Sequence, residues 1–255
     1  NIEVQPGKPT RETGRAALTA LKKASEDLKE GLLNALATGP IDKSTIHSDE
    51  FPFRGHTEFL NDYFTVKDSL MLMVSDNLKV GLVTDHVPLK DVASLITRER
   101  LEIKINLLDQ SLRKDFGIKK PKIAILGLNP HAGDGGVIGM EEEQIIKPLI
   151  QEYKNRNKLV FGPFSADGFF ATGQYLKYDG VLAMYHDQGL IPFKSIAFED
   201  GVNFTAGLPV IRTSPDHGTG YMIAGKDQAD ERSMREAIYR AYEISKHRSE
   251  PSTEK

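Results

Sequence analysis

The sequence has no cysteine among its 255 residues. This absence excludes a disulfide framework, a thiolate nucleophile and any zinc or iron–sulfur site built on cysteine. A metal ion would therefore have to be bound by His, Asp or Glu. The sequence also contains no apolar run of the roughly 18–20 residues that a membrane span needs, and no segment that reads as a signal peptide. We therefore expect a cytoplasmic protein that does not act in a membrane.

An excess of charge of one sign is missing as well. Lys and Arg total 33, and Asp and Glu total 36, which gives a formal net charge of −3. This balance argues against binding to nucleic acid through bulk positive charge. Hydrophobic residues make up 39% and charged residues 27% of the chain, which is typical of a globular protein and too apolar for disorder. The length fits one large domain, or two modest ones that share a core.

The common phosphate-binding motifs are absent too. The sequence has neither a G-x-G-x-x-G fingerprint nor a Walker loop. Residues 132–139 (AGDGGVIG) are rich in glycine, and such a loop lets the backbone approach a ligand closely. An ordinary strand-to-helix loop is the simpler interpretation of this stretch.

What the sequence does contain is an alternation of short apolar runs and amphipathic stretches. The apolar runs have the length and continuity of buried strands and lie at residues 80–84, 122–126, 159–161 and 181–184. The stretches with helical spacing of apolar residues lie at 15–37, 98–116, 141–155 and 227–246. This alternation predicts an α/β fold with a largely parallel sheet and helices on both faces.

Three of the seven histidines follow predicted strands. They are His86, His131 and His186. Because the carboxyl ends of strands face the ligand crevice in open α/β sheets, these imidazoles are candidates for one metal site. A single histidine at a strand end is more often an ordinary hydrogen-bonded residue, so the hypothesis depends on all three together.

A second polar group lies near the C-terminus. Lys194, Asn203 and Arg212 combine two cations with an amide, which suits a phosphate or a carboxylate. The small polar residues Asp216, His217, Gly218 and Thr219 follow and have the composition of a loop that wraps a nucleotide. For each residue taken alone, a solvent-facing position near a turn is the simpler interpretation.

Five motifs occur together in a fixed order, and together they resemble the 4-hydroxythreonine-4-phosphate dehydrogenase (PdxA) family of vitamin B6 biosynthesis. They are residues 55–60 (GHTEFL), 84–91 (TDHVPLKD), 127–136 (GLNPHAGDGG), 183–189 (AMYHDQG) and 212–219 (RTSPDHGT). The resemblance covers the chain from about Thr38 to Ala224.

The resemblance implies a fold like that of isocitrate and isopropylmalate dehydrogenases, with two α/β/α lobes around a cleft. Residues 1–52 and 200–255 would form the cofactor-side lobe, and residues 53–199 the lobe for metal, substrate and dimerisation. The family begins with a Gly-rich GDPxGIGPE-like segment that this sequence lacks, so we expect the cofactor-side lobe to be incomplete at its N-terminal side. The resemblance also implies a homodimer whose active site is completed at the interface.

The same resemblance implies roles for the candidate residues. His86, His131 and His186 match the family's metal ligands, and zinc is the expected metal, with Mg²⁺, Mn²⁺ or Co²⁺ as alternatives. NAD is the expected cofactor, and the choice between NAD and NADP stays open. The residues that match the substrate contacts are His56, Thr57, Lys194, Asn203 and Arg212; those that match the cofactor loop are Asp216, His217, Gly218 and Thr219.

The implied reaction is the oxidation of 4-phosphooxy-L-threonine by NAD with loss of CO₂, which gives 3-amino-2-oxopropyl phosphate. Asp187 is a candidate proton acceptor, although a role in orienting His186 is equally reasonable. Three alternatives stay open: a related dehydrogenase of threonate or erythronate 4-phosphate, a non-catalytic metal- or phosphate-binding protein, and a metal-dependent hydrolase.

Overall fold

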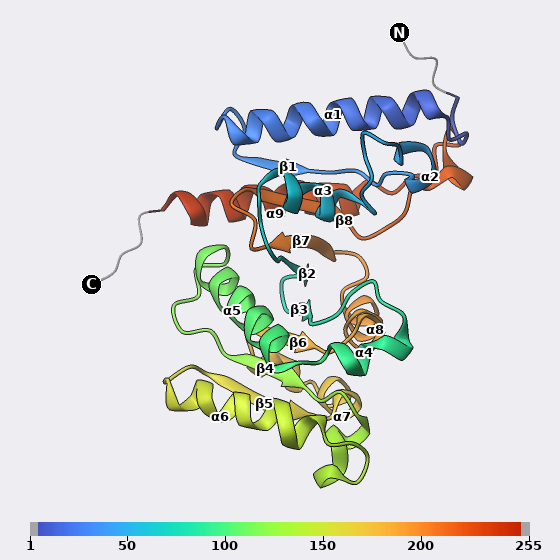
Figure 1. The fold of residues 1–255 in the computed structure, drawn as a ribbon. Helices are drawn as coiled ribbons and strands as arrows, with labels where there is room; N and C mark the ends of the chain where they lie inside the picture. Colours follow the sequence, from blue (N-terminus) through green and yellow to red (C-terminus); the bar gives the residue numbers. More distant parts are fainter. Residues whose placement is uncertain (1–4, 251–255) are drawn as a thin grey trace.

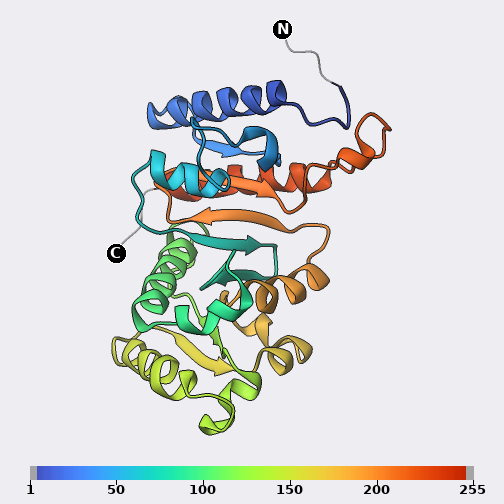
Figure 2. The same cartoon turned by 45° about the vertical axis from the view of Figure 1, so that its right-hand side comes forward.

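A computed structural model describes residues 5–250. The centre of the molecule is one eight-stranded sheet in the order β1-β8-β7-β2-β3-β6-β4-β5. Figures 1 and 2 show these strands side by side along the length of the molecule. The strands are β1 (Ala35–Ala37), β2 (Leu70–Val74), β3 (Lys79–Leu82), β4 (Ile123–Leu126), β5 (Val160–Phe164), β6 (Gly180–Ala183), β7 (Val202–Ala206) and β8 (Ile211–Pro215).

The sheet is mixed. Its half from β3 through β6 and β4 to β5 is parallel, and these are the strands that the apolar runs predict. β2 and β7 instead form antiparallel pairs with their neighbours, and β1 is parallel to β8. The α/β class is confirmed, whereas the largely parallel sheet holds for one half only.

Helices cover both faces of the sheet (Figure 1). α5 (Arg98–Lys114), α6 (Lys147–Asn155) and α9 (Arg232–Ser249) lie on one face; α7 (Ala166–Ala171) and α8 (His186–Ile196) lie on the other. The end of the sheet at β1 is covered by α1 (Arg11–Lys29) and α3 (His56–Tyr63). Shorter elements complete the described chain: α2 (Lys43–Ile46), α4 (Leu89–Leu95), η1 (Pro130–Gly136), η2 (Glu142–Ile146), η3 (Gln174–Lys177) and η4 (Tyr221–Ile223).

The core consists of two apolar layers separated by the sheet. In β4, Ile123 and Ile125 pack toward α5 and α6, while Ala124 and Leu126 pack toward α7 and α8. The alternation follows from strand geometry, because successive side chains point to opposite faces. Both faces are covered, so all four residues are apolar and buried.

One predicted helix ends earlier than expected. The apolar spacing predicted a helix through residue 37, but α1 ends at Lys29. Gly31 has φ +75°, a left-handed conformation that glycine adopts without strain and that commonly ends a helix. The chain then turns into β1, which begins at Ala35. Among residues 5–250, no helix combines the length and apolar character of a membrane span.

Candidate active site

A cavity of about 680 Å³ lies beside the C-terminal ends of β3 and β6 and reaches across to β7 and β8. Most of the predicted site residues line it. They are His56, Thr57, His86, His186, Lys194, Asn203, Arg212, Asp216, His217 and Gly218. Three predicted residues, His131, Asp187 and Thr219, are not part of its lining.

Two of the three predicted metal ligands are neighbours. β3 and β6 pair in parallel, with Gly81 opposite Leu182, so the segments that follow the two strands leave the sheet at the same edge. His86 lies in the loop after β3, and His186 is the first residue of α8 after β6. Their ring centroids are 5.8 Å apart and the rings are inclined by 49°. Two imidazoles from segments far apart in the sequence therefore face the same space.

An aspartate accompanies each of these histidines. Asp187 Oδ1 lies 2.8 Å from His186 Nδ1, and the backbone N–H of His86 donates to Asp85 Oδ1 over 2.7 Å. The His86 side chain, with Nδ1 3.7 Å from Asp85 Oδ2, together with this backbone N–H, holds the pKa of Asp85 well below its usual range. The interaction with Asp85 in turn raises the pKa of the His86 imidazole. Asp85 was not among the predicted site residues, although its position directly before His86 was a usable signal.

His131 lies on η1, outside the cavity lining. It is exposed, and it belongs to a run of left-handed residues with φ values of 54° at His131, 50° at Ala132 and 43° at Asp134. Side chains rarely adopt this region, so the turn must be held by its surroundings. Within residues 5–250, no group of three or more His, Asp or Glu side chains is arranged to hold a metal ion. One chain thus brings His86 and His186 together but does not add His131.

The left-handed turn packs against the buried carboxylate of Glu142. Glu142 is fully buried and accepts hydrogen bonds from the backbone N–H of Asn129 at 2.8 Å and from its Nδ2 at 2.9 Å. The carboxylate lies so close to Gly133 that a Cβ there would come within 2.7 Å of Glu142 Oε2. Glu142 was missed by the sequence analysis, because nothing in its local pattern separates it from an exposed helical glutamate.

Cations line the same cavity. Arg212, in β8, is only 5% exposed, and burial lowers the pKa of its guanidinium to about 10. It therefore stays charged at neutral pH. Lys194, in α8, forms an ion pair with Asp216 at 3.0 Å. Two charged side chains of this kind, beside the amide of Asn203, form a site suited to an anion.

His56 and Thr57 are the first two residues of α3, so this helix begins at the cavity. The first N–H groups of a helix have no partner within it and favour an anion nearby. Burial, with a smaller contribution from the charge of Arg212, lowers the pKa of His56 to about 3. The imidazole is consequently neutral at physiological pH and can either donate or accept a hydrogen bond.

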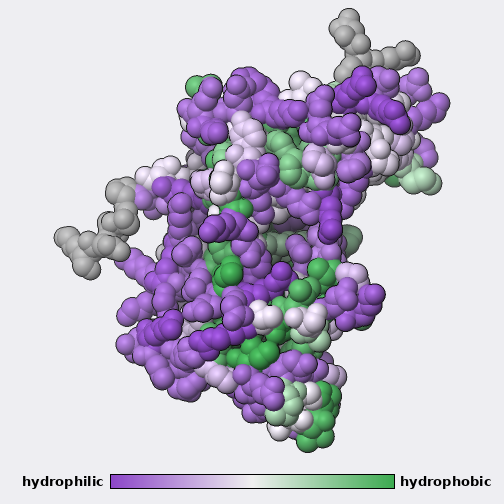
Figure 3. Space-filling view, viewed as in Figure 1, coloured by the Kyte–Doolittle hydropathy of each residue, from purple (hydrophilic) through white to green (hydrophobic). Residues whose placement is uncertain are grey.

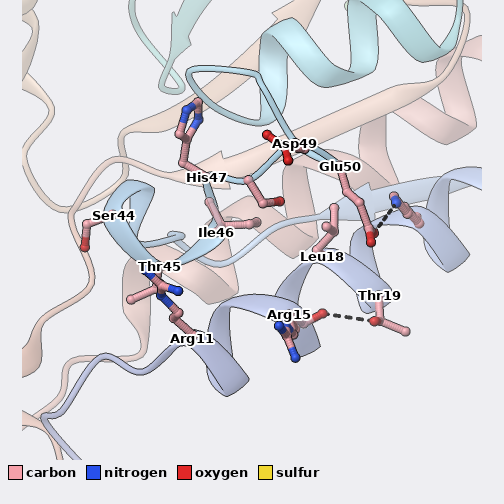
Figure 4. A pocket seen from close by; sticks show the side chains of 12 residues that line it. Arg11, Arg15, Leu18, Thr19, Ser44, Thr45, Ile46, His47, Asp49 and Glu50 are labelled. Carbon is pink, nitrogen blue, oxygen red and sulfur yellow. Dashed lines mark hydrogen bonds and ion pairs between the residues drawn. The ribbon is translucent and has the colours of Figure 1, made fainter.

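A second hollow, of about 610 Å³, lies between α1 and the segment around α2. Figure 4 shows Arg11 and Arg15 on its α1 side, and Ser44 and Thr45 opposite. None of the predicted site residues lines it. We therefore assign the candidate active site to the cavity that contains His86, His186 and Arg212.

Comparison with known proteins identifies the family. Residues 1–241 match the family described as "Pyridoxal phosphate biosynthetic protein PdxA". The chain belongs to the PdxA family. The resemblance inferred from the five motifs is thus confirmed.

Two curated relatives carry the same name. The 4-hydroxythreonine-4-phosphate dehydrogenase of Bacteroides thetaiotaomicron is 50% identical over 248 residues, which cover 97% of this chain and 68% of the relative. The enzyme of the same name from Sulfurihydrogenibium sp. is 47% identical over 238 residues, which cover 93% of this chain and 73% of the relative. Both relatives are therefore dehydrogenases by name.

Solved structures agree with this family and its fold. A 4-hydroxythreonine-4-phosphate dehydrogenase from Klebsiella pneumoniae superposes with a TM-score of 0.85 at 38% identity, covering 95% of this chain and 73% of that one. A terephthalate 1,2-cis-dihydrodioldehydrogenase from Burkholderia xenovorans superposes with a TM-score of 0.68 at 27% identity, covering 93% and 75%. The fold is thus shared with a dehydrogenase named for a different substrate.

Proposed function

We propose that this PdxA protein oxidises 4-hydroxythreonine 4-phosphate, in the biosynthesis of pyridoxal phosphate. The observation that carries the proposal is the lining of one cavity, which combines two adjacent imidazoles with a buried arginine and a lysine. The names of the relatives supply the substrate and the reaction class. The product we expect is 3-amino-2-oxopropyl phosphate, formed when the oxidised β-keto acid loses CO₂.

The anionic groups of the substrate would bind to the cations. Arg212 offers a planar fork of donors and Lys194 a compact charge, so together they suit the phosphate and carboxylate ends of one small molecule. The start of α3 at His56 and Thr57 adds N–H donors at the same cavity. A neutral His56 would hydrogen-bond the substrate without adding a further charge.

A divalent metal fits the two neighbouring histidines. Imidazole nitrogens are ligands that zinc accepts readily, and Mg²⁺, Mn²⁺ and Co²⁺ stay as alternatives. When bound, such an ion would lower the pKa of the substrate hydroxyl and favour the loss of its proton. Asp187 would accept a hydrogen bond from Nδ1 of His186 and so leave Nε2 free to bind the ion. We therefore propose a positioning role for Asp187 rather than proton abstraction.

The third histidine would come from a second copy of the chain. His131 is exposed on a turn outside the cavity of its own chain, so it can complete a three-histidine site only by reaching another copy. The segment that follows it exposes Val137 at 82%, Ile138 at 41% and Met140 at 46% of their surface. Figure 3 shows hydrophobic side chains at the lower tip of the molecule, where Figure 1 draws the chain in yellow-green. These features support a homodimer with a shared site.

NAD would bind beside the loop at residues 216–219. His217 and Gly218 line the cavity, and a Cβ added at Gly218 would meet no atom within 4 Å. Open space next to main-chain donors suits a nucleotide. When bound, NAD would accept the hydride from the substrate carbon that bears the hydroxyl.

A second candidate is a dehydrogenase of another acid on the same fold, such as threonate or erythronate 4-phosphate. The Burkholderia xenovorans structure supports this alternative, since its name records a different substrate on a similar fold. The buried Arg212 favours an anionic substrate, but it does not separate one phosphorylated acid from another.

The test is NADH formation by the purified full-length protein with 4-hydroxythreonine 4-phosphate, with and without a chelator. We expect NADH formation that the chelator abolishes and that zinc restores. Threonate 4-phosphate and erythronate 4-phosphate serve as matched alternatives. Turnover of either one in preference to the threonine derivative would reassign the substrate. A folded protein that binds metal but shows no NAD binding in a titration would point to a non-catalytic role, and hydrolysis without NAD would point to a hydrolase.

A further inference from the structure

The guanidinium of Arg212 is held by hydroxyl groups. Its Nε and Nη2 donate to Thr38 Oγ1 over 3.0 and 2.8 Å, and its Nη1 donates to Thr205 Oγ1 over 3.2 Å. An arginine has five N–H donors. These three contacts leave two donors for a ligand on the side of the cavity that Arg212 lines.

The chemistry of these partners is unusual for a buried cation. Lys104 and Lys194, which line the same cavity, are paired with Asp68 and Asp216 at 2.6 and 3.0 Å. In the part of the chain that the structure describes, Arg212 has no such carboxylate partner. A hydroxyl accepts a hydrogen bond without cancelling charge, so the full positive charge remains available to a ligand.

Both hydroxyls are fixed in place. Thr38 and Thr205 are 6% and 1% exposed, so water does not compete for them. Thr38 directly follows β1, and its backbone N–H donates to the carbonyl oxygen of Thr213 over 2.9 Å. β1 in turn pairs with β8, where Leu36 lies opposite Arg212. The acceptor and the guanidinium are thus carried by two adjacent strands.

We propose that Thr38 is a positioning residue for anion binding, because it fixes the edge of the Arg212 guanidinium and directs the remaining donors into the cavity. Thr205 supports the same side chain with one contact, where Thr38 supplies two. This inference rests on the proposed function for the identity of the anion, which is the phosphate or the carboxylate of the substrate. We call the three hydrogen bonds from Arg212 to Thr38 and Thr205 the Arg212 clamp. The clamp depends only on the geometry of this chain and not on the identity of the anion.

The test compares Thr38→Val with Thr38→Ser in the full-length protein. Valine keeps nearly the same volume and removes the acceptor, whereas serine retains it. Calorimetric titrations with inorganic phosphate and with L-threonine probe the phosphate and the carboxylate ends of the substrate separately. We expect T38V to weaken the binding of one probe by about tenfold or more, T38S to stay within about threefold of wild type, and T205V to fall between them.

Steady-state kinetics add a readout that a merely structural role would not move. In T38V, the KM for the phosphorylated substrate should rise by about tenfold while kcat changes much less, since Arg212 would bind an anionic group of the substrate and not the carbon that loses the hydride. T38S should have a KM close to that of wild type. Circular dichroism verifies the fold of each variant. If T38V does not fold, Thr38→Cys replaces it, because a thiol is a much weaker acceptor of similar size.

Three results would overturn the proposal. They are equal binding of both probes by wild type and T38V, a T38S variant as weak as T38V, and a wild-type protein that binds neither probe. A protein that binds a probe in a Thr38-dependent way but does not oxidise 4-hydroxythreonine 4-phosphate would instead refute the proposed function and leave the clamp intact.

Discussion

The imidazole rings of His86 and His186 lie side by side, with centroids 5.8 Å apart, at the ends of two parallel strands. Asp187 contacts Nδ1 of His186 at 2.8 Å and thereby fixes the orientation of that ring. Partners of this kind determine which nitrogen of a histidine is free to bind a metal.

We expect Asp187→Asn to weaken zinc or cobalt binding by about tenfold to a hundredfold without unfolding the protein, since partners of metal-binding histidines contribute this much. Cobalt absorption titrations measure the affinity directly. Asp62→Asn, an exposed change on α3, is the matched control and should bind cobalt like wild type. Unchanged cobalt affinity in the Asp187 variant would show that Asp187 does not position His186 for metal binding.

A shared site makes a prediction about mixed dimers. If His131 acts on the partner's His86 and His186, a dimer of one His86→Ala subunit and one His131→Ala subunit retains one intact site. Random exchange of the two inactive variants should then restore about one quarter of wild-type activity, as expected for a two-fold dimer in which half of the molecules are mixed. If His131 acts within its own chain, every site in the mixture lacks a ligand and no activity returns.

The buried ion pair between Asp115 and Arg248 should matter for stability. Arg248 Nε donates to Asp115 Oδ1 over 2.7 Å, the two side chains are 11% and 3% exposed, and Ser111 Oγ also donates to the carboxylate. Arg248→Met leaves the carboxylate buried without its cation, so we expect a loss of about 3–5 kcal/mol in the free energy of unfolding.

Urea denaturation measures this change. Arg235→Met, which breaks an exposed pair with Glu231 on α9, is the control and should cost less than about 0.5 kcal/mol. If both variants unfold at the same urea concentration, the pair does not link the end of α9 to α5.

The pKa of His56 predicts a dependence of stability on pH. Burial and Arg212 lower this pKa from 6.5 to about 3 in the folded protein. The unfolded chain therefore binds a proton at His56 as pH falls below about 6.5, while the folded protein does not, so acid favours unfolding over this range. Above about pH 6.5 both states are neutral at this position and the effect vanishes.

We expect His56→Asn to flatten the loss of unfolding free energy between about pH 6 and pH 4, by less than the roughly 1.4 kcal/mol per pH unit that one proton supplies. Denaturant titrations at several pH values provide the comparison. His47→Asn, at an exposed position, should follow the wild-type curve. A His56 variant that is equally sensitive to acid would show that other groups control the response.

Four helices (α1, α5, α6 and α9) and the parallel strands from β3 to β5 were predictable because their patterns are local. The predicted helix 98–116 matches α5 (Arg98–Lys114), where apolar residues recur at helical spacing and Thr97 caps the first turn. β1, β2, β7 and β8 were not predicted. In β7 and β8, polar residues such as Asn203 and Arg212 line the cavity and interrupt the apolar pattern of a strand. The helix predicted at 15–37 is present as α1, but its C-terminal end was predicted too late, because the apolar residues continue past the left-handed Gly31 that ends the helix.

The candidate site was predictable in its residue types and only partly in its geometry. Motif order pointed to the residues that line the cavity, and strand order explains why His86 and His186 meet. The clamp on Arg212 depends on the pairing of β1 with β8 and of β7 with β8, which no local pattern encodes. The left-handed turn that places His131 outside the cavity could not be predicted from local sequence either, because it depends on packing against the carboxylate of Glu142, which lies further along the chain.

Because Arg212 is buried without a carboxylate partner among residues 5–250, we expect the lifetime of the protein to depend on whether an anion is bound. Moving a guanidinium out of water costs free energy, and two hydroxyls offset this cost only in part. A bound anion supplies the remainder, so occupancy and folding are linked: at a ligand concentration of 100 Kd the folded state gains about 2.7 kcal/mol. We therefore expect copies with an empty cavity to unfold more often and to be degraded first, so that the supply of substrate would itself set how much of this protein persists in the cell.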